Sequence, residues 1–176
     1  YYGTVTGLLP YKKPPGLIDL QPGYALRPEP GAITDDTFIR GDFTRFFLQT
    51  RPPQTPAMLA EWLNKNADFS KWWPPMMAPL ERIEKSEVAA EEAGQTADQG
   101  GGAGWWTPLG IMHADEPERA AAEARNLCRI WKAPLERDLL SGAQAGVAES
   151  QREEATVDSV VEAVLGQCGP LGSALL

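Results

Sequence analysis

Cysteine and histidine are scarce in this chain of 176 residues, which has two cysteines and one histidine. Cys128 and Cys168 lie far apart, and neither belongs to a spacing typical of a metal site. His113 has no cysteine or serine partner in a known catalytic arrangement, which argues against a catalytic triad. We therefore expect two reduced, buried thiols and a packed or capping histidine.

Long apolar runs and basic clusters are also missing. No run reaches the roughly 18 apolar residues of a membrane helix, and the first residues lack the basic-then-apolar pattern of a signal peptide. Acidic residues number 24 against 16 basic ones, a net charge of -8, and no dense stripe of lysine and arginine offsets it. The sequence thus predicts a cytoplasmic protein that binds neither a membrane nor nucleic acid.

Strands of alternating apolar and polar residues are absent as well, which favours an all-α fold. Residues 1–30 hold six prolines and four glycines and predict an irregular Pro/Gly-rich arm. Residues 31–176 predict a single all-α domain, an orthogonal helical bundle. The apolar residues of the arm also suit burial in a homo-oligomer.

Helical spacing and capping residues place the expected helices. A bent aromatic connector around Pro74-Pro75 should carry Trp72 and Trp73 into the core, whereas Trp105 and Trp106 could be core or could stack on a ligand. The predicted helices lie in residues 34–50, from Thr55-Pro56 onward, 80–93, 118–132, 135–147 and 156–166, with a buried helix or turn at 105–112.

The segment Thr34-Asp35-Asp36-Thr37 opens the first of these helices. Adjacent carboxylates and a hydroxyl suit a hard cation such as Mg²⁺, Mn²⁺ or Ca²⁺, because these ions prefer oxygen ligands. The alternative is a helix cap, with acids favoured by the helix dipole. The residues alone favour the cap.

A glycine-rich loop at Gly100, Gly101, Gly102 and Gly104 precedes Trp105. Glycines allow positive φ and let backbone N–H groups approach an anionic ligand closely. The loop lacks the Lys-Ser/Thr ending of a Walker motif and the spacing of a dinucleotide fingerprint, so a flexible linker would have the same pattern.

The order and content of these two segments resemble the ADP-ribosylglycohydrolase family. That family carries Thr-Asp-Asp-Thr at a helix start, here Thr34 to Thr37, and a Gly-rich loop before an apolar helix, here Gly100 to Pro108. The resemblance implies an all-α fold and a binuclear Mg²⁺ or Mn²⁺ site that holds the ribose and a water for hydrolysis of an N- or O-glycosidic ADP-ribosyl bond. It makes Thr34, Asp35 and Asp36 metal ligands and the two aspartates catalytic. It also makes Gly100, Gly101, Gly102, Gly104 and Trp105 substrate-binding, with ADP-ribose or an ADP-ribosylated molecule as the partner.

The sequence departs from the family pattern in three places. The Pro-rich arm stands where family members have a Gly-Asp-Ala-type helix, and no second Asp-x-Asp-Thr segment follows Asp158. The family loop is similar to Asn-Gly-x-x-Met-Arg-x-x-Pro, and anchoring it on Pro108 places Gly100 at its Asn and Trp105 at its Arg. An active hydrolase would therefore have to be longer than this chain or take ligands from another subunit. A catalytically inactive ADP-ribose-binding relative and a helical oligomerising module are the alternatives.

Overall fold

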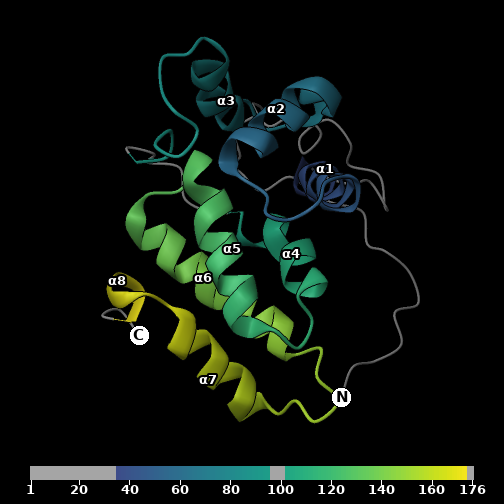
Figure 1. Cartoon of the computed structure of the whole chain (residues 1–176), viewed down its shortest axis with the longest axis vertical. Helices are drawn as coiled ribbons and strands as arrows, with labels where there is room; N and C mark the ends of the chain where they lie inside the picture. The colour runs from purple at the N-terminus through teal and green to yellow at the C-terminus, as the bar shows by residue number, and fades with distance from the viewer. Residues whose placement is uncertain (1–34, 96–101, 174–176) are drawn as a thin grey trace, which may run out of the picture.

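The computed structural model describes residues 35–95 and 102–173, and within these ranges the chain is helical with no strand. The predicted all-α class is therefore confirmed. Figure 1 shows α1, α2 and α3 at one end of the molecule, α4, α5 and α6 in the middle, and α7 and α8 at the other end. The Pro/Gly-rich arm, Thr34, Gly100 and Gly101 lie outside the described residues.

Helix α1 (Asp35–Gln49) supplies one side of an aromatic core. Its apolar face is buried as its helical spacing predicts, and Phe43 at its centre is fully buried. The Phe43 ring centroid lies 4.7 Å from that of Trp106, 5.8 Å from that of Trp131 and 6.3 Å from that of Trp72. Edge-to-face and tilted contacts of this kind add to the stabilisation that burial of the rings provides.

Helix α2 (Pro56–Asn66) begins as predicted, because the Thr55 hydroxyl accepts a hydrogen bond of 3.2 Å from the backbone N–H of Met58. The bent connector follows as two 3₁₀ turns, η1 (Phe69–Lys71) and η2 (Pro74–Met76). Trp72 is fully buried, and its indole N–H donates to Asp42 over 2.8 Å. Trp73 packs against the core from a partly buried position.

The helix predicted at 80–93 is wrong in both boundaries. Helix α3 spans Met77–Glu84, and turns occupy the residues from Lys85 to Gln95. Ser86 adopts a positive φ of 58°, a conformation that no residue of a right-handed helix has. The polar spacing after Glu84 therefore belongs to turns that close against Arg129, whose backbone carbonyl accepts from the N–H of Gly94.

The 3₁₀ turn η3 (Ala103–Trp106) leads into α4 (Thr107–Met112), and α5 (Pro117–Leu127) and α6 (Pro134–Glu149) follow. The helix predicted at 118–132 ends early, because the chain tightens into the 3₁₀ turn η4 (Cys128–Ile130). His113 is buried after α4, with its Nε2 2.6 Å from the Glu123 carboxylate, so the prediction of a packed histidine is confirmed. Cys128 is a buried free thiol, and burial raises its pKa to about 12.

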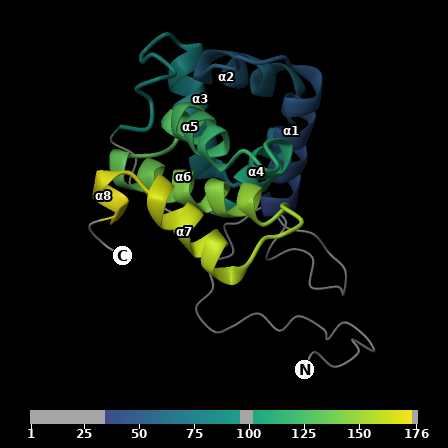
Figure 2. The same cartoon turned by 60° about the horizontal axis from the view of Figure 1, so that its bottom comes forward.

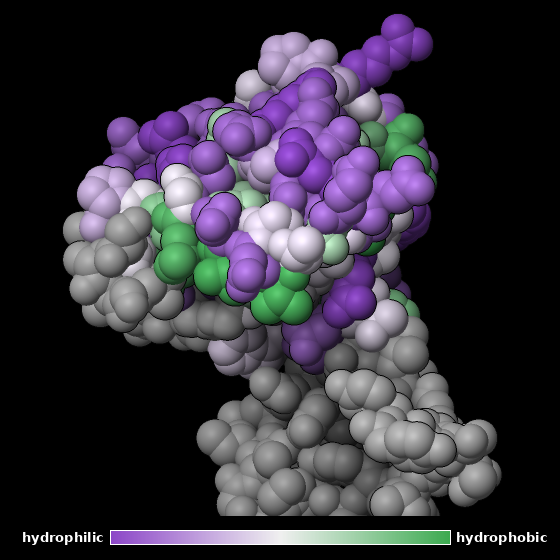
Figure 3. Space-filling view, turned by 90° about the horizontal axis from the view of Figure 1, so that it is seen from below, coloured by the Kyte–Doolittle hydropathy of each residue, from purple (hydrophilic) through white to green (hydrophobic). Residues whose placement is uncertain are grey.

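Helix α7 (Val157–Gln167) lies along α6, and the short α8 (Pro170–Ser173) follows it (Figure 2). Thr156 caps α7 as predicted by accepting from the N–H of Ser159. Val157, Val161 and Leu165 are 80%, 48% and 47% exposed. Figure 3 looks at the end of the molecule where α7 lies and shows apolar groups among hydrophilic ones there. No described helix is long and apolar enough to cross a membrane.

Candidate functional site

Asp35 and Asp36 occupy the first turn of α1, where the helix dipole favours negative charge. Asp35 is only 7% exposed, whereas Asp36 is exposed. Burial raises the pKa of the Asp35 carboxyl, and the charge of Asp36 raises it further, although backbone N–H donors at the helix start oppose the shift. The pair thus combines one desolvated carboxyl with one that faces solvent.

Trp105 joins the glycine loop to this acid pair. Its indole Nε1–H donates a short hydrogen bond to Oδ1 of Asp36 across 69 residues of sequence. The bond fixes the orientation of the Asp36 carboxylate. The structure therefore brings together the two segments that the sequence singled out, with η3 packed beside α1.

The loop before Trp105 has a shape that requires glycine at one position. Gly102 has a φ of 76°, and a Cβ atom there would lie 2.5 Å from the ring carbons of Trp105. The Trp105 ring is 4% exposed, so it offers little surface on which a base could stack. Ala103 and Gly104, by contrast, are exposed.

Two buried polar side chains, one on α6 and one just before α6, lie beside the loop. Gln144 is 1% exposed, and its Nε2 donates to the carbonyl of Ala103 over 3.3 Å. The Lys132 ammonium lies 5.9 Å from the centroid of the Trp105 ring. Burial lowers the pKa of Lys132, and Glu136, 3.9 Å away, opposes that shift. A pocket of about 170 Å³ is lined by Ala103, Lys132, Glu136, Leu139 and Leu140.

Neither Lys132 nor Gln144 was singled out from the sequence. Gln144 shares a helix face with Leu140 and Ala148, both buried, and a polar residue on a buried stripe is a signal that could have marked it. Lys132 carries no such signal, because it is only the last residue of the helix predicted at 118–132, and the helix ends earlier, at Leu127.

The remaining predicted site residues fall into two groups. Asp35, Asp36, Gly102, Gly104 and Trp105 are gathered at the start of α1 and in η3, whereas Thr34, Gly100 and Gly101 lie outside the described residues. Within the part of the chain that the structure describes, no group of three or more histidine, cysteine or acidic side chains gathers around one point.

The chain was also compared with known proteins. No protein-family model, no curated protein and no solved structure matches it. The resemblance to the ADP-ribosylglycohydrolases therefore stays a prediction from the two short segments that carry it.

Proposed function

We propose that this chain carries part of the active site of a metal-dependent hydrolase of ADP-ribosyl groups, with Asp35 and Asp36 as ligands of Mg²⁺ or Mn²⁺. The observation that supports the proposal is the hydrogen bond from Trp105 to Asp36. It brings the acid pair and the glycine loop to one place, although the two segments are far apart in sequence. A hydrolase site of the kind that the resemblance implies needs both.

The donor set present fits a hard cation. Two adjacent carboxylates at a helix start supply anionic oxygen ligands, and Mg²⁺ is commonly held by one or two carboxylates while it keeps several of its waters. The raised pKa of Asp35 also supports a cation at this place, because a cation beside the two carboxylates would offset the desolvation of Asp35 and its repulsion from Asp36. If bound there, a divalent ion held by Asp35 and Asp36 would supply a polarised water near neutral pH and a charge for orienting the ribose diol.

In this proposal, different residues of the chain would transfer the proton and contact the phosphate. Asp35, being partly desolvated and close in sequence to an exposed acid, suits the transfer of a proton to or from the attacking water. Asp36 is held in one orientation by Trp105. In this proposal the backbone N–H groups of the exposed residues Ala103 and Gly104 would approach a phosphate oxygen of ADP-ribose.

Thermal unfolding with and without metal tests the proposal. Mg²⁺ or Mn²⁺ should raise the Tm of the chain by mass action, by about 2.7 kcal/mol of added stability at a hundredfold excess over Kd. Asp36→Ala should abolish the rise because it removes a ligand. Asp158→Ala is the matched control, since Asp158 is an exposed acid in the first turn of another helix, α7.

Asp158→Ala should keep the full response to metal. If the unaltered chain shows no metal-dependent rise, the metal site is wrong. If Asp158→Ala loses the response together with Asp36→Ala, the response comes from general binding to acidic groups and not from the pair.

A second candidate is binding of ADP-ribose without hydrolysis. It is favoured by the exposed Ala103, which lines the pocket of about 170 Å³, because neither feature depends on a metal. Calorimetric titration of ADP-ribose in the presence of EDTA separates the two candidates. Saturable binding under those conditions, with no metal response in Tm, supports the binding protein over the hydrolase.

A further inference from the structure

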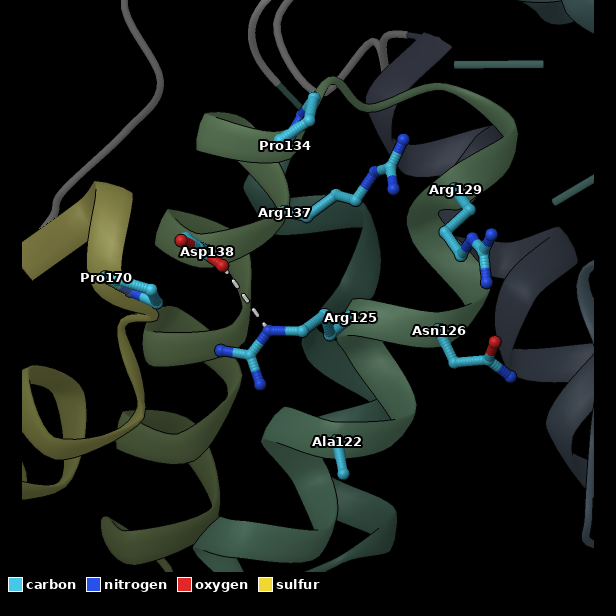
Figure 4. A pocket seen from close by; sticks show the side chains of 8 residues that line it. All are labelled: Ala122, Arg125, Asn126, Arg129, Pro134, Arg137, Asp138 and Pro170. Atoms are coloured by element: carbon cyan, nitrogen blue, oxygen red, sulfur yellow. Dashed lines mark ion pairs between the residues drawn. The ribbon is translucent and has the colours of Figure 1, made fainter. Parts of the chain in front are cut away.

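A second pocket, of about 530 Å³, lies on another part of the molecule and is rich in arginine. It is open to solvent between the end of α5, the start of α6 and α8 (Figure 4). It shares no residue with the acid pair or the glycine loop. Its lining residues are Ala122, Arg125, Asn126, Arg129, Pro134, Arg137, Asp138 and Pro170.

The backbone holds all three arginines in place. Arg125 donates to the carbonyl of Gln167 over 2.8 Å, and its Nε lies 3.4 Å from Asp138. Arg129 donates through Nε to the carbonyl of Glu91 over 2.8 Å. Arg137 donates through Nε to the carbonyl of Lys132 over 2.6 Å. Each guanidinium is therefore oriented by a neutral acceptor, which leaves its charge uncompensated by that contact.

Arg129 and Arg137 differ from Arg125 in having no ion pair with a carboxylate among the residues that the structure describes. In Figure 4 they come from different helices, whereas Arg125 turns to Asp138. Burial holds the pKa of the Arg137 guanidinium below its ordinary value, and the charge of Arg129 also lowers it, whereas Cys128 and Asp138 raise it. Two cations thus repel each other at one pocket.

One nitrogen of this pair lacks any acceptor. Nη2 of Arg137 is shielded from solvent and has no hydrogen-bond partner within the described part of the chain. Leaving a charged, buried donor without an acceptor is unfavourable. An anion with several oxygens, reached by a small turn of the guanidinium, would satisfy this nitrogen and relieve the repulsion from Arg129.

We propose that the pocket binds a phosphoryl group between the guanidinium groups of Arg129 and Arg137. The two side chains approach from separate helices, so their planar forks meet an occupant from two directions. A tetrahedral oxyanion offers oxygens to both forks, whereas a planar carboxylate pairs best with one. The volume exceeds that of inorganic phosphate and is within the range of pockets that hold small organic ligands.

Calorimetric titration of the full chain in EDTA at low, matched ionic strength tests the site. Sodium phosphate and pyrophosphate should bind saturably and more tightly than sodium acetate, and binding should weaken with added NaCl. Adenosine monophosphate distinguishes the source of the group, because tighter binding than phosphate indicates an ester ligand and equal binding indicates the free anion. On binding, the Nε–H resonances of Arg129 and Arg137 should shift in NMR spectra.

Substitutions assign the binding to these residues. Arg129→Gln and Arg137→Lys should each weaken phosphate binding by about tenfold, since each removes a forked charge-assisted contact. Arg119→Gln is the matched control, because Arg119 is exposed on α5 and pairs with Glu116 at 3.1 Å. Arg119→Gln should bind phosphate as the unaltered chain does, and so should Asp36→Ala, which separates this site from the proposed hydrolase site.

Three results would overturn the proposal. One is the absence of phosphate and pyrophosphate binding by the unaltered chain. Another is acetate binding as tight as phosphate binding. The third is a set of Nε–H resonances in which Arg119 shifts as much as Arg129 and Arg137, and this result remains measurable even if a variant does not fold.

Discussion

Asp35 is a single acid whose ionisation costs the fold stability. It is almost fully buried, next to a second carboxylate, and its pKa is raised above the ordinary value of 3.8. A carboxyl with a raised pKa in the folded state binds its proton more tightly there than in the unfolded chain. Stability is therefore lost as the pH rises from 3.8 through the folded-state pKa, and it stays lower above that pKa.

Asp35→Asn should consequently stabilise the metal-free protein at about pH 7, because an amide pays no ionisation penalty there. The gain should shrink as the pH falls and vanish below 3.8, where both carboxyl groups are protonated. Urea unfolding in EDTA across this range measures the effect. Asp158→Asn, in the exposed first turn of α7, should instead lose a little stability near neutral pH. If Asp35→Asn were less stable than the unaltered protein at neutral pH, the ionised Asp35 carboxylate would not be destabilising the fold.

At the scale of the elements, glycines on α6 set how closely its neighbours pack. A Cβ atom on Gly142 would lie 2.7 Å from the backbone carbonyl of Val164 in α7 and would also meet the sulfur of Cys168. A Cβ atom on Gly146 would lie 2.6 Å from a methyl group of Val164. The exposed valines of α7 are thus on its outer face because its inner face lies directly against the backbone of α6.

Gly142→Ala should therefore destabilise the protein by about 1–3 kcal/mol, since the carbonyl of Val164 belongs to a helix and cannot move away alone. Gly41→Ala is the control in α1, where a Cβ atom would meet nothing within 4 Å. It should be neutral or should stabilise by about 0.5–1 kcal/mol, because alanine favours a helix over glycine. Chemical denaturation measures the free energy of unfolding of both variants. An equal change in the two variants would show that helix propensity, and not packing against α7, determines the effect of the alanine.

The sequence predicted several elements because their signals are local. Thr55 before Pro56 and Thr156 before α7 are caps that act within one turn, and both were confirmed. The end of α3 was predicted wrongly, because Ser86 is left-handed and the turns after it contact a distant residue, Arg129, through the N–H of Gly94. Spacing in a single segment carries no information about such a contact.

At the scale of the whole molecule, the candidate site arises from segments that the sequence can name but cannot bring together. Asp36 and Trp105 were both singled out, yet their hydrogen bond depends on how α1 and η3 pack in the aromatic core. Lys132 and Gln144 reach the same place only through the path of α6. Residue types thus singled out Asp36 and Trp105 separately, whereas their proximity could not be predicted.

The arginine pocket has the same origin. Arg125 and Arg129 are four residues apart, which on a helix indicates a shared face, but Arg137 joins them only because the chain reverses between η4 and α6. The molecule has a net charge of -8, so this local excess of positive charge is contrary to its average. Net charge alone therefore did not predict it.

The central claim is that Asp35, Asp36 and the loop before Trp105 form one site for a divalent ion and an ADP-ribosyl group. Crystals grown or soaked with Mn²⁺ and ADP-ribose test it most directly, because manganese is located by its anomalous scattering. We predict an anomalous peak within about 2.5 Å of a carboxylate oxygen of Asp35 or Asp36, with ADP-ribose density beside Ala103 and Gly104. Crystals with no anomalous peak near the pair, or with ADP-ribose bound elsewhere, would contradict it.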